Sequence, residues 1–225
     1  MEKEQFLLDS NSEIVNYYSK ILDKKRLQLI VKRIIDILLS ITLIVLLSPI
    51  LLFISISIKL DDAGPICFRQ TRVTRYGKEF KIIKFRTMIL NAEEIGSQIT
   101  VDNDPRITKV GKKIRKLRLD ELPQLFNILT GDMTFVGTRP EVPKYVNHYT
   151  DEMKVTLLVR AGVTSMASIE FKDESLILKG SIDPNTTYLE KILPEKMKIN
   201  ILEIEKFSLK RDLKILYLTV LKVMK

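Results

Sequence analysis

Asp120 and Glu121 are adjacent carboxylates that lie among basic residues in the sequence. Seven basic residues fall between positions 69 and 86, and a second basic group falls between positions 109 and 118. Arg139 stands in a Gly-Thr-Arg-Pro segment, which can bring backbone N–H groups and a guanidinium onto an anion. This pattern indicates a site for a phosphate-bearing substrate, with the two carboxylates at its centre.

The local sequence predicts a helix over 120–129, with Asp120 at its start. The positive end of the helix dipole and the nearby arginines would then favour ionised carboxylates. An ionised carboxylate can attack phosphorus, and a second carboxylate can help to hold a divalent cation that bridges phosphates. The alternative is that the pair only caps the helix, which is the commoner role of such a pair.

Composition excludes several other kinds of chemistry. Cys67 and His148 are the only cysteine and the only histidine, so an internal disulfide and a Cys/His zinc site are both excluded. The net charge of +9 suits an anionic partner, and it suits a solvated basic surface equally well. Nucleic acid is not expected as a partner, because aromatic residues able to stack on bases are sparse around the basic segments.

An apolar run extends from Ile34 to Ile58 and carries one charge, Asp36. A straight helix of this length would span roughly 37 Å, enough to cross a hydrocarbon core of about 30 Å. Against a single crossing stand Ser48-Pro49, which predicts a kink, and the basic residues that flank both ends. A helical hairpin that enters one leaflet and returns is the alternative, and the residues alone leave both open.

The remaining segments predict an α-rich α+β fold in one domain. Alternating residues at 66–73 and 79–88 predict a short β-hairpin, and 108–117 predicts a basic helix. A surface helix is predicted over 13–29 and two helices over 192–225. The last helix suits a membrane surface and suits a core-facing position equally well. No secretory signal peptide is predicted.

The string DPRITKVGKKIRKLRLDELPQLFNILTGDMTFVGTRPE, residues 104–141, strongly resembles the signature of the bacterial sugar transferases, the monotopic polyprenyl-phosphate phosphoglycosyl transferases. The upstream pieces KRIIDILLS, GPICFRQ and KIIKFRTM are similar to that family in the same order. The resemblance extends over residues 32–174. It implies an N-terminal extension over 1–31, a re-entrant membrane helix over 32–60 and a catalytic domain over 61–225 that ends in interfacial helices.

The resemblance also implies a reaction and a set of site residues. A sugar 1-phosphate would pass from a UDP-sugar to undecaprenyl phosphate, with release of UMP, as the first membrane step of surface glycan assembly. Asp120 would form the covalent intermediate and Glu121 would help to hold Mg²⁺. Phosphate-binding roles fall on Arg115 and Arg139, and more weakly on Lys84 and Arg86. The helix break falls on Ser48 and Pro49, and the membrane interface on Lys32 and Arg33.

The family's setting implies the cytoplasmic face of the bacterial inner membrane, membrane lipids as partners, and a homodimer as one open oligomeric state. The sequence departs from the family pattern at Arg118, where a serine is usual, and at Thr138, where a proline is usual. The segment 160–174 also differs, so the donor sugar stays open. The rival reading is a non-catalytic basic anchor or scaffold that binds anionic lipid or nucleic acid.

Overall fold

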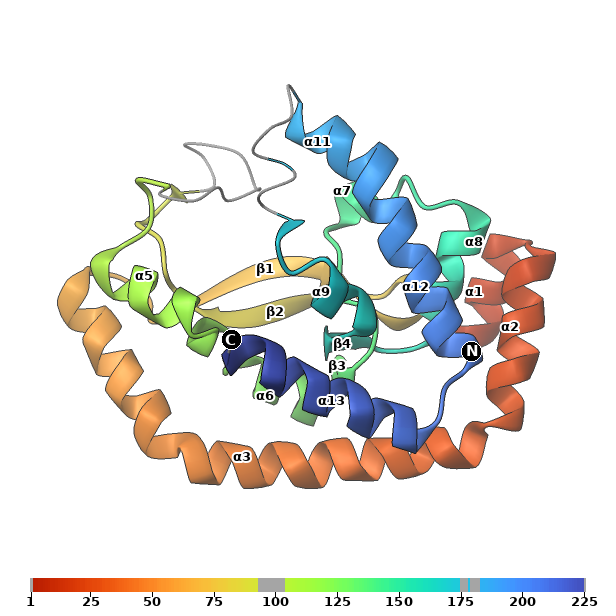
Figure 1. Cartoon of the computed structure of the whole chain (residues 1–225), viewed down its shortest axis with the longest axis horizontal. Helices are drawn as coiled ribbons and strands as arrows, with labels where there is room; N and C mark the ends of the chain where they lie inside the picture. Colours follow the sequence, from red (N-terminus) through yellow and green to blue (C-terminus); the bar gives the residue numbers. More distant parts are fainter. Residues whose placement is uncertain (1, 93–103, 175–177, 179–182, 225) are drawn as a thin grey trace.

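The computed structural model describes residues 2–92, 104–174, 178 and 183–224. Two small two-stranded sheets lie at the centre, and helices surround them (Figure 1). The predicted α-rich α+β class is confirmed. The shorter helices are α5 (Lys109–Lys116), α6 (Gln124–Thr130), α7 (Pro143–Val146), α8 (Asp151–Lys154), α9 (Met166–Glu170) and α11 (Pro184–Thr187).

The predicted hairpin is confirmed. Strand β1 (Cys67–Val73) pairs antiparallel with β2 (Glu79–Phe85). The turn between them places Tyr76 at φ 61° and Gly77 at φ 74°, a left-handed pair that matches the twist of a two-residue hairpin loop. Phe80 and Ile82 on β2 face the core, so the hairpin has one buried side.

A second sheet was not predicted. Strands β3 (Met133–Val136) and β4 (Ala161–Thr164) are parallel and only four residues long, too short for a periodic signal. Two glycines let their ends approach closely: a Cβ added at Gly162 would lie 2.2 Å from the amide nitrogen of Gly137. Beyond β3 the chain therefore turns sharply into the loop that carries Arg139.

The apolar run forms one continuous helix, α3 (Arg26–Asp61), which bends in its second half (Figure 1). Pro49 lies inside this helix and cannot donate a hydrogen bond to the carbonyl of Val45. The Ser48 hydroxyl donates to that carbonyl instead, at 2.8 Å. The predicted kink at Ser48-Pro49 is therefore a bend without a break. The parts of α3 before and after the bend do not fold back on each other.

Both ends of α3 are attached to the same folded body. Near its start, the buried Asp36 carboxylate accepts a hydrogen bond of 2.6 Å from the Thr134 hydroxyl on β3. At its end, the Asp61 carboxylate accepts one of 2.8 Å from the backbone N–H of Val110 on α5. Between these points one side of α3 packs on the core, and the other side is exposed and apolar, including Leu38, Val45, Leu46, Leu52 and Phe53.

The N-terminal extension packs one side of its second helix against the core. Helices α1 (Glu2–Ser10) and α2 (Glu13–Lys24) precede α3. Val15 of α2 is fully buried, and it packs with Leu22 against Val155 and Ile201. The surface helix predicted over 13–29 is shorter than expected, because α2 ends at Lys24; one side of α2 is covered by the core and the other is exposed, including Asn16, Tyr17 and Lys20.

The two predicted C-terminal helices are confirmed as α12 (Leu193–Glu205) and α13 (Leu209–Met224). Helix α12 contributes Leu193 and Met197 to the core. Helix α13 buries Ile215 while leaving Leu213 and Tyr217 each 64% exposed. The sequence left open whether the apolar residues of this helix face the core or the outside. In the structure one apolar side faces the core and another faces outward.

Candidate functional site

The two carboxylates lie in a short 3-10 turn between α5 and α6. Arg118 takes a left-handed backbone conformation, at φ 56°, and ends the helical path of α5. Asp120 and Glu121 follow in the turn Leu119–Glu121, and α6 begins only at Gln124. The helix predicted over 120–129 begins later than expected: Asp120 lies in the 3-10 turn, and α6 starts at Gln124, after Leu122 and Pro123. No side-chain capping bond forms here, so the capping alternative loses its support.

Helix α6 is held against the hairpin by one amide. Asn127 accepts a hydrogen bond of 2.9 Å from the backbone N–H of Ile83 and donates one of 2.9 Å to the carbonyl of Lys81. The Asn127 side chain thus occupies hydrogen-bonding positions on β2 that a neighbouring strand would use. They fix the turn before α6 close to the end of β2, where Lys84 lies.

Glu121 is the carboxylate that the cations surround. Its Oε1 lies 2.6 Å from Arg139 Nη2, 3.2 Å from Lys84 Nζ and 3.9 Å from Arg118 Nη1. Burial by itself would raise the pKa of Glu121, but Arg139 and Lys84 outweigh burial and hold the pKa well below its usual range. Burial lowers the pKa of Lys84 in spite of the attraction of Glu121. Glu121 is therefore ionised, as predicted.

Asp120 is in the opposite electrostatic condition. Its Oδ1 is buried and has no hydrogen-bond partner in the part of the chain that the structure describes. Burial raises the pKa of Asp120 above its ordinary value, and the neighbouring Glu121 charge raises it further. The charges of Lys84, Arg115 and Arg118 oppose this rise without cancelling it, because the closest cations lie against Glu121. A desolvated carboxylate without partners is a stronger nucleophile once it is deprotonated.

The predicted phosphate-binding residues divide into those near the carboxylates and one that lies elsewhere. Arg139 and Lys84 touch Glu121, and the charge of Arg115 lowers the pKa of Asp120, so these three belong to one site. Arg115 makes no ion pair with any residue in the described ranges; its guanidinium lies 3.5 Å from the Thr87 hydroxyl. Arg115 is therefore a guanidinium available to an anion.

Arg86 is not part of this site. Its buried guanidinium donates to the carbonyls of Asp62 and Ala63, at 2.7 and 3.1 Å, and pairs with the Asp62 carboxylate at 3.2 Å. These contacts secure the loop that follows α3. The expectation that Arg86 binds substrate phosphate is therefore corrected to a structural role.

The loop that carries Arg139 is rigidly supported. The carbonyl of Thr138 accepts a hydrogen bond of 2.8 Å from the N–H of Gly162, and the carbonyl of Pro140 accepts one of 3.1 Å from Arg72. Arg139 is thereby held beside Glu121 by contacts on both sides of it. This arrangement positions its guanidinium before any substrate binds.

Lys32 and Arg33, predicted at the membrane interface, have their charged ends against the protein body. Lys32 pairs with Asp212 at the start of α13, at 2.5 Å. Arg33 donates to the carbonyls of Ile128 and Leu129, at 2.6 and 3.1 Å, and so caps the C-terminal end of α6. Sequence reasoning missed this cap, although a helix C-terminus commonly takes a basic partner. Helix α3 therefore contacts the C-terminal end of α6, the helix that follows the two carboxylates.

The carboxylate oxygens fit a divalent cation that also binds phosphate. All three ion pairs of Glu121 use Oε1, and Asp120 Oδ1 has no partner among the described residues. Mg²⁺ binds through one or two carboxylates together with substrate phosphates. No group of three or more His, Cys, Asp or Glu side chains occurs within the described ranges, so substrate oxygens would complete the coordination.

A family model described as "Bacterial sugar transferase" matches residues 27–225. The match includes α3, both sheets, the two carboxylates and the C-terminal helices. Only α1 and α2 precede it.

Curated relatives share long segments with this chain. A UDP-N-acetylgalactosamine-undecaprenyl-phosphate N-acetylgalactosaminephosphotransferase from Aeromonas hydrophila is 44% identical over 62% of the chain and 34% of its own length. A UDP-glucose:undecaprenyl-phosphate glucose-1-phosphate transferase from Escherichia coli is 37% identical over 86% of the chain and 40% of its own length. An undecaprenyl-phosphate galactose phosphotransferase from Salmonella typhimurium is 36% identical over 67% of the chain and 34% of its own length. The chain thus spans little more than a third of the length of these relatives.

Proposed function

Because the chain belongs to the bacterial sugar transferase family, we propose that it transfers a sugar 1-phosphate from a UDP-sugar to undecaprenyl phosphate. The observation that carries this proposal is the pair of unlike carboxylates. Asp120 is half-buried and its Oδ1 has no hydrogen-bond partner among the described residues, whereas Glu121 beside it is ion-paired with Arg139 and Lys84. One carboxylate is thereby left for nucleophilic attack while its neighbour organises the cations.

The reaction proceeds by two displacements at one phosphorus atom. A carboxylate oxygen of Asp120 attacks the phosphorus that bears the sugar, the bond from that phosphorus to the bridging oxygen breaks, and UMP leaves with the electron pair. An oxygen of undecaprenyl phosphate then attacks the same phosphorus and the Asp120 carboxylate departs. The products are UMP and undecaprenyl diphosphate-sugar, and Asp120 is regenerated.

The cations of the site stabilise the charge that develops on the phosphate oxygens. Arg115 has no acidic partner in the described part of the chain, and Arg139 can turn from Glu121 toward the donor diphosphate. Mg²⁺ bound with help from Glu121 would neutralise further negative charge on the diphosphate. Because Lys84 is buried and already contacts Glu121, it keeps that carboxylate in place.

The membrane arrangement follows from the attachment of α3 at both ends. Asp36 near its start bonds to β3 and Asp61 at its end bonds to α5, which supports a helix that enters the bilayer and returns to the same side. A crossing helix would place these two points on opposite faces of the bilayer. The exposed apolar side of α3 would contact lipid, and the catalytic body would lie on the cytoplasmic face of the inner membrane, as the basic flanks favour.

Thiol labelling tests this topology. Single cysteines are placed at Gln28 and at Ala63 in a Cys67→Ser background, and intact cells are treated with a membrane-impermeant thiol reagent. Both positions should stay unlabelled until the cells are permeabilised. Labelling of one position only would establish a crossing helix and contradict the re-entrant arrangement.

A release assay tests the activity. The protein is incubated with undecaprenyl phosphate, Mg²⁺ and one of UDP-glucose, UDP-galactose or UDP-N-acetylgalactosamine, and UMP is measured. The expected result is acceptor-dependent release of UMP from at least one donor, lost on chelation of the metal. UMP formation with none of a wider set of UDP-sugars would remove the proposed function and favour a scaffold.

A further inference from the structure

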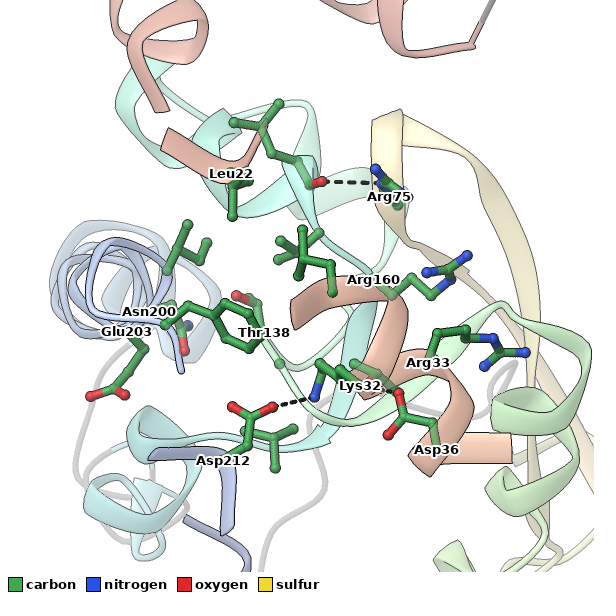
Figure 2. Close-up of a pocket in the computed structure, with 18 of the residues that line it drawn as sticks. Leu22, Lys32, Arg33, Asp36, Arg75, Thr138, Arg160, Asn200, Glu203 and Asp212 are labelled. Carbon is green, nitrogen blue, oxygen red and sulfur yellow. Dashed lines mark hydrogen bonds and ion pairs between the residues drawn. The ribbon is translucent and has the colours of Figure 1, made fainter. Parts of the chain in front are cut away.

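A cavity lies away from the two carboxylates. Its volume is about 600 Å³, within the range of roughly 300–1,000 Å³ that is usual for small-molecule sites. The first turns of α3 form one wall, α12 and α13 form another, and α2 and the ends of β3 and β4 close it (Figure 2). Asp120 and Glu121 are not among its lining residues, so this cavity is distinct from the proposed catalytic site.

Two polar groups in this mostly apolar cavity have no partner. Asn200 is 4% exposed, and its amide makes no hydrogen bond with any residue that the structure describes. The Thr138 hydroxyl oxygen is likewise buried and unpaired within the described ranges. Figure 2 shows both among the side chains that line the cavity. A ligand with polar atoms would supply hydrogen-bond partners to both groups.

Positive charge exceeds negative charge around the cavity. Seven basic and four acidic residues line it. Three of the acids are ion-paired, in the pairs Lys3–Asp23, Lys32–Asp212 and Arg211–Glu203, and the fourth, Asp36, bonds to Thr134. The other four basic residues, all arginines, have no carboxylate partner in the described part of the chain: Arg26, Arg33, Arg75 and Arg160. The charge balance therefore suits an anionic ligand.

Of these four arginines, Arg26 is the one whose charge is available to a ligand. Arg33 and Arg160 already donate to backbone carbonyls at the end of α6, and they lie on the same side of the cavity as Arg75 in Figure 2. Arg26 is exposed at the first residue of α3 and makes no bond to a described side chain. If the anionic group of a ligand lay at Arg26, the apolar interior of the cavity could hold the hydrocarbon chain of that ligand.

We propose that this cavity binds one anionic phospholipid, with the phosphate beside Arg26, a glycerol ester carbonyl at the amide of Asn200 and an acyl chain in the apolar interior. The location favours a lipid over a soluble anion, because the walls include the start of α3 and the start of α13, whose outer sides are apolar and exposed. This inference rests on the proposed membrane association of α3. It does not depend on the transfer reaction.

Asn200→Leu separates a binding role from a structural one, because it replaces an unpaired amide by an apolar group of similar size. Native mass spectrometry of the full detergent-purified chain, titrated with dioleoylphosphatidylglycerol, should show one retained lipid, and the variant should retain about fivefold less. The thermal unfolding midpoint of the variant should be unchanged or higher. The matched control is Asn16→Leu, at an exposed position of α2, which should retain lipid like the unmodified protein.

Two further arms identify the ligand class. Dioleoylphosphatidylcholine should be retained about fivefold less than the glycerol lipid, since its headgroup carries no net charge, and inorganic phosphate should not displace the bound lipid. Equal retention of the two lipids, displacement by phosphate, unaltered retention by Asn200→Leu, or a loss of stability in that variant would each overturn the proposal. Mass detection needs no turnover, so failure here is distinguishable from failure of the transferase activity.

Discussion

Asp120→Asn should eliminate both turnover and the covalent phosphosugar adduct. The substitution keeps the size of the side chain and removes its nucleophilic oxygen, so we expect UMP release to fall by at least about 10⁴-fold, as for loss of other enzyme nucleophiles. Incubation with donor labelled in the sugar phosphate, followed by denaturation, measures the adduct directly. Near-normal turnover, or product formation without label on residue 120, would contradict the assignment.

The same variant should be at least as stable as the unmodified protein at pH 7. Burial raises the pKa of Asp120 above its ordinary value, so its ionisation is less favourable in the folded state than in the unfolded state. At pH values below the ordinary value of 3.8 both states are protonated and the residue is neutral in its effect. As pH rises through that value and then through the raised folded pKa, ionisation increasingly disfavours the fold. Thermal unfolding of the two proteins from acid to neutral pH should show this trend.

Asp151→Asn is the matched control for stability. Asp151 is an exposed carboxylate on α8 that pairs with Lys154, so its replacement should change neither UMP release nor the pH trend. A large loss of stability in Asp120→Asn would show instead that Asp120 is a structural carboxylate. That outcome would return the pair to the capping role that the sequence left open.

Arg139→Ala should reduce UMP release by about 10²- to 10³-fold, the usual cost of removing one positioned donor from a developing anion. The guanidinium lies 2.6 Å from Glu121, closer than Lys84 at 3.2 Å or Arg118 at 3.9 Å, and contacts on both sides of its loop hold it there. Its removal should also raise the pKa of Glu121, because Arg139 is the strongest of the charges that lower it. Initial rates across donor and Mg²⁺ concentrations measure the effect.

Arg69→Ala is the control for net charge. Arg69 is exposed on β1 and makes no ion pair with any residue that the structure describes, so removing its charge should leave UMP release within about twofold of normal, as for other surface changes. Glu121→Gln combined with Arg139→Ala should cost less than the sum of the two single effects, because the residues act through one ion pair. Full additivity, or an Arg139→Ala enzyme of normal rate, would remove Arg139 from the site.

The local elements were predictable where neighbouring residues decide the conformation. The hairpin follows from alternation and from a turn that needs a left-handed pair at Tyr76 and Gly77, and the bend of α3 follows from Pro49. The basic helix predicted over 108–117 is α5, which begins after Thr108, whose hydroxyl accepts a hydrogen bond from the N–H of Gly111. Each of these outcomes depends on contacts within a few residues.

Other outcomes depended on contacts between distant parts of the chain. The parallel pair β3–β4 joins residues 133–136 to 161–164, and its strands are too short to be seen singly. Arg86 and Arg139 are both arginines in basic segments, yet one is enclosed by the loop after α3 and the other faces Glu121. Residue type and spacing cannot separate these two environments. The sequence also predicts a helix over 88–95; the structure describes residues 88–92 of this segment, and there Met88 forms a β-bridge with Ile107.

By itself, the sequence determined that an Asp-Glu pair stands among basic residues, that an apolar helix bends at Ser48-Pro49, and which family the motifs resemble. Only the tertiary structure decided that the closest cations pair with Glu121 and leave Asp120 Oδ1 without a partner among the described residues, and that Arg33 of α3 caps α6. The reason is that solvent exposure and distances between charges determine a carboxylate's pKa, and both arise only when remote segments pack together.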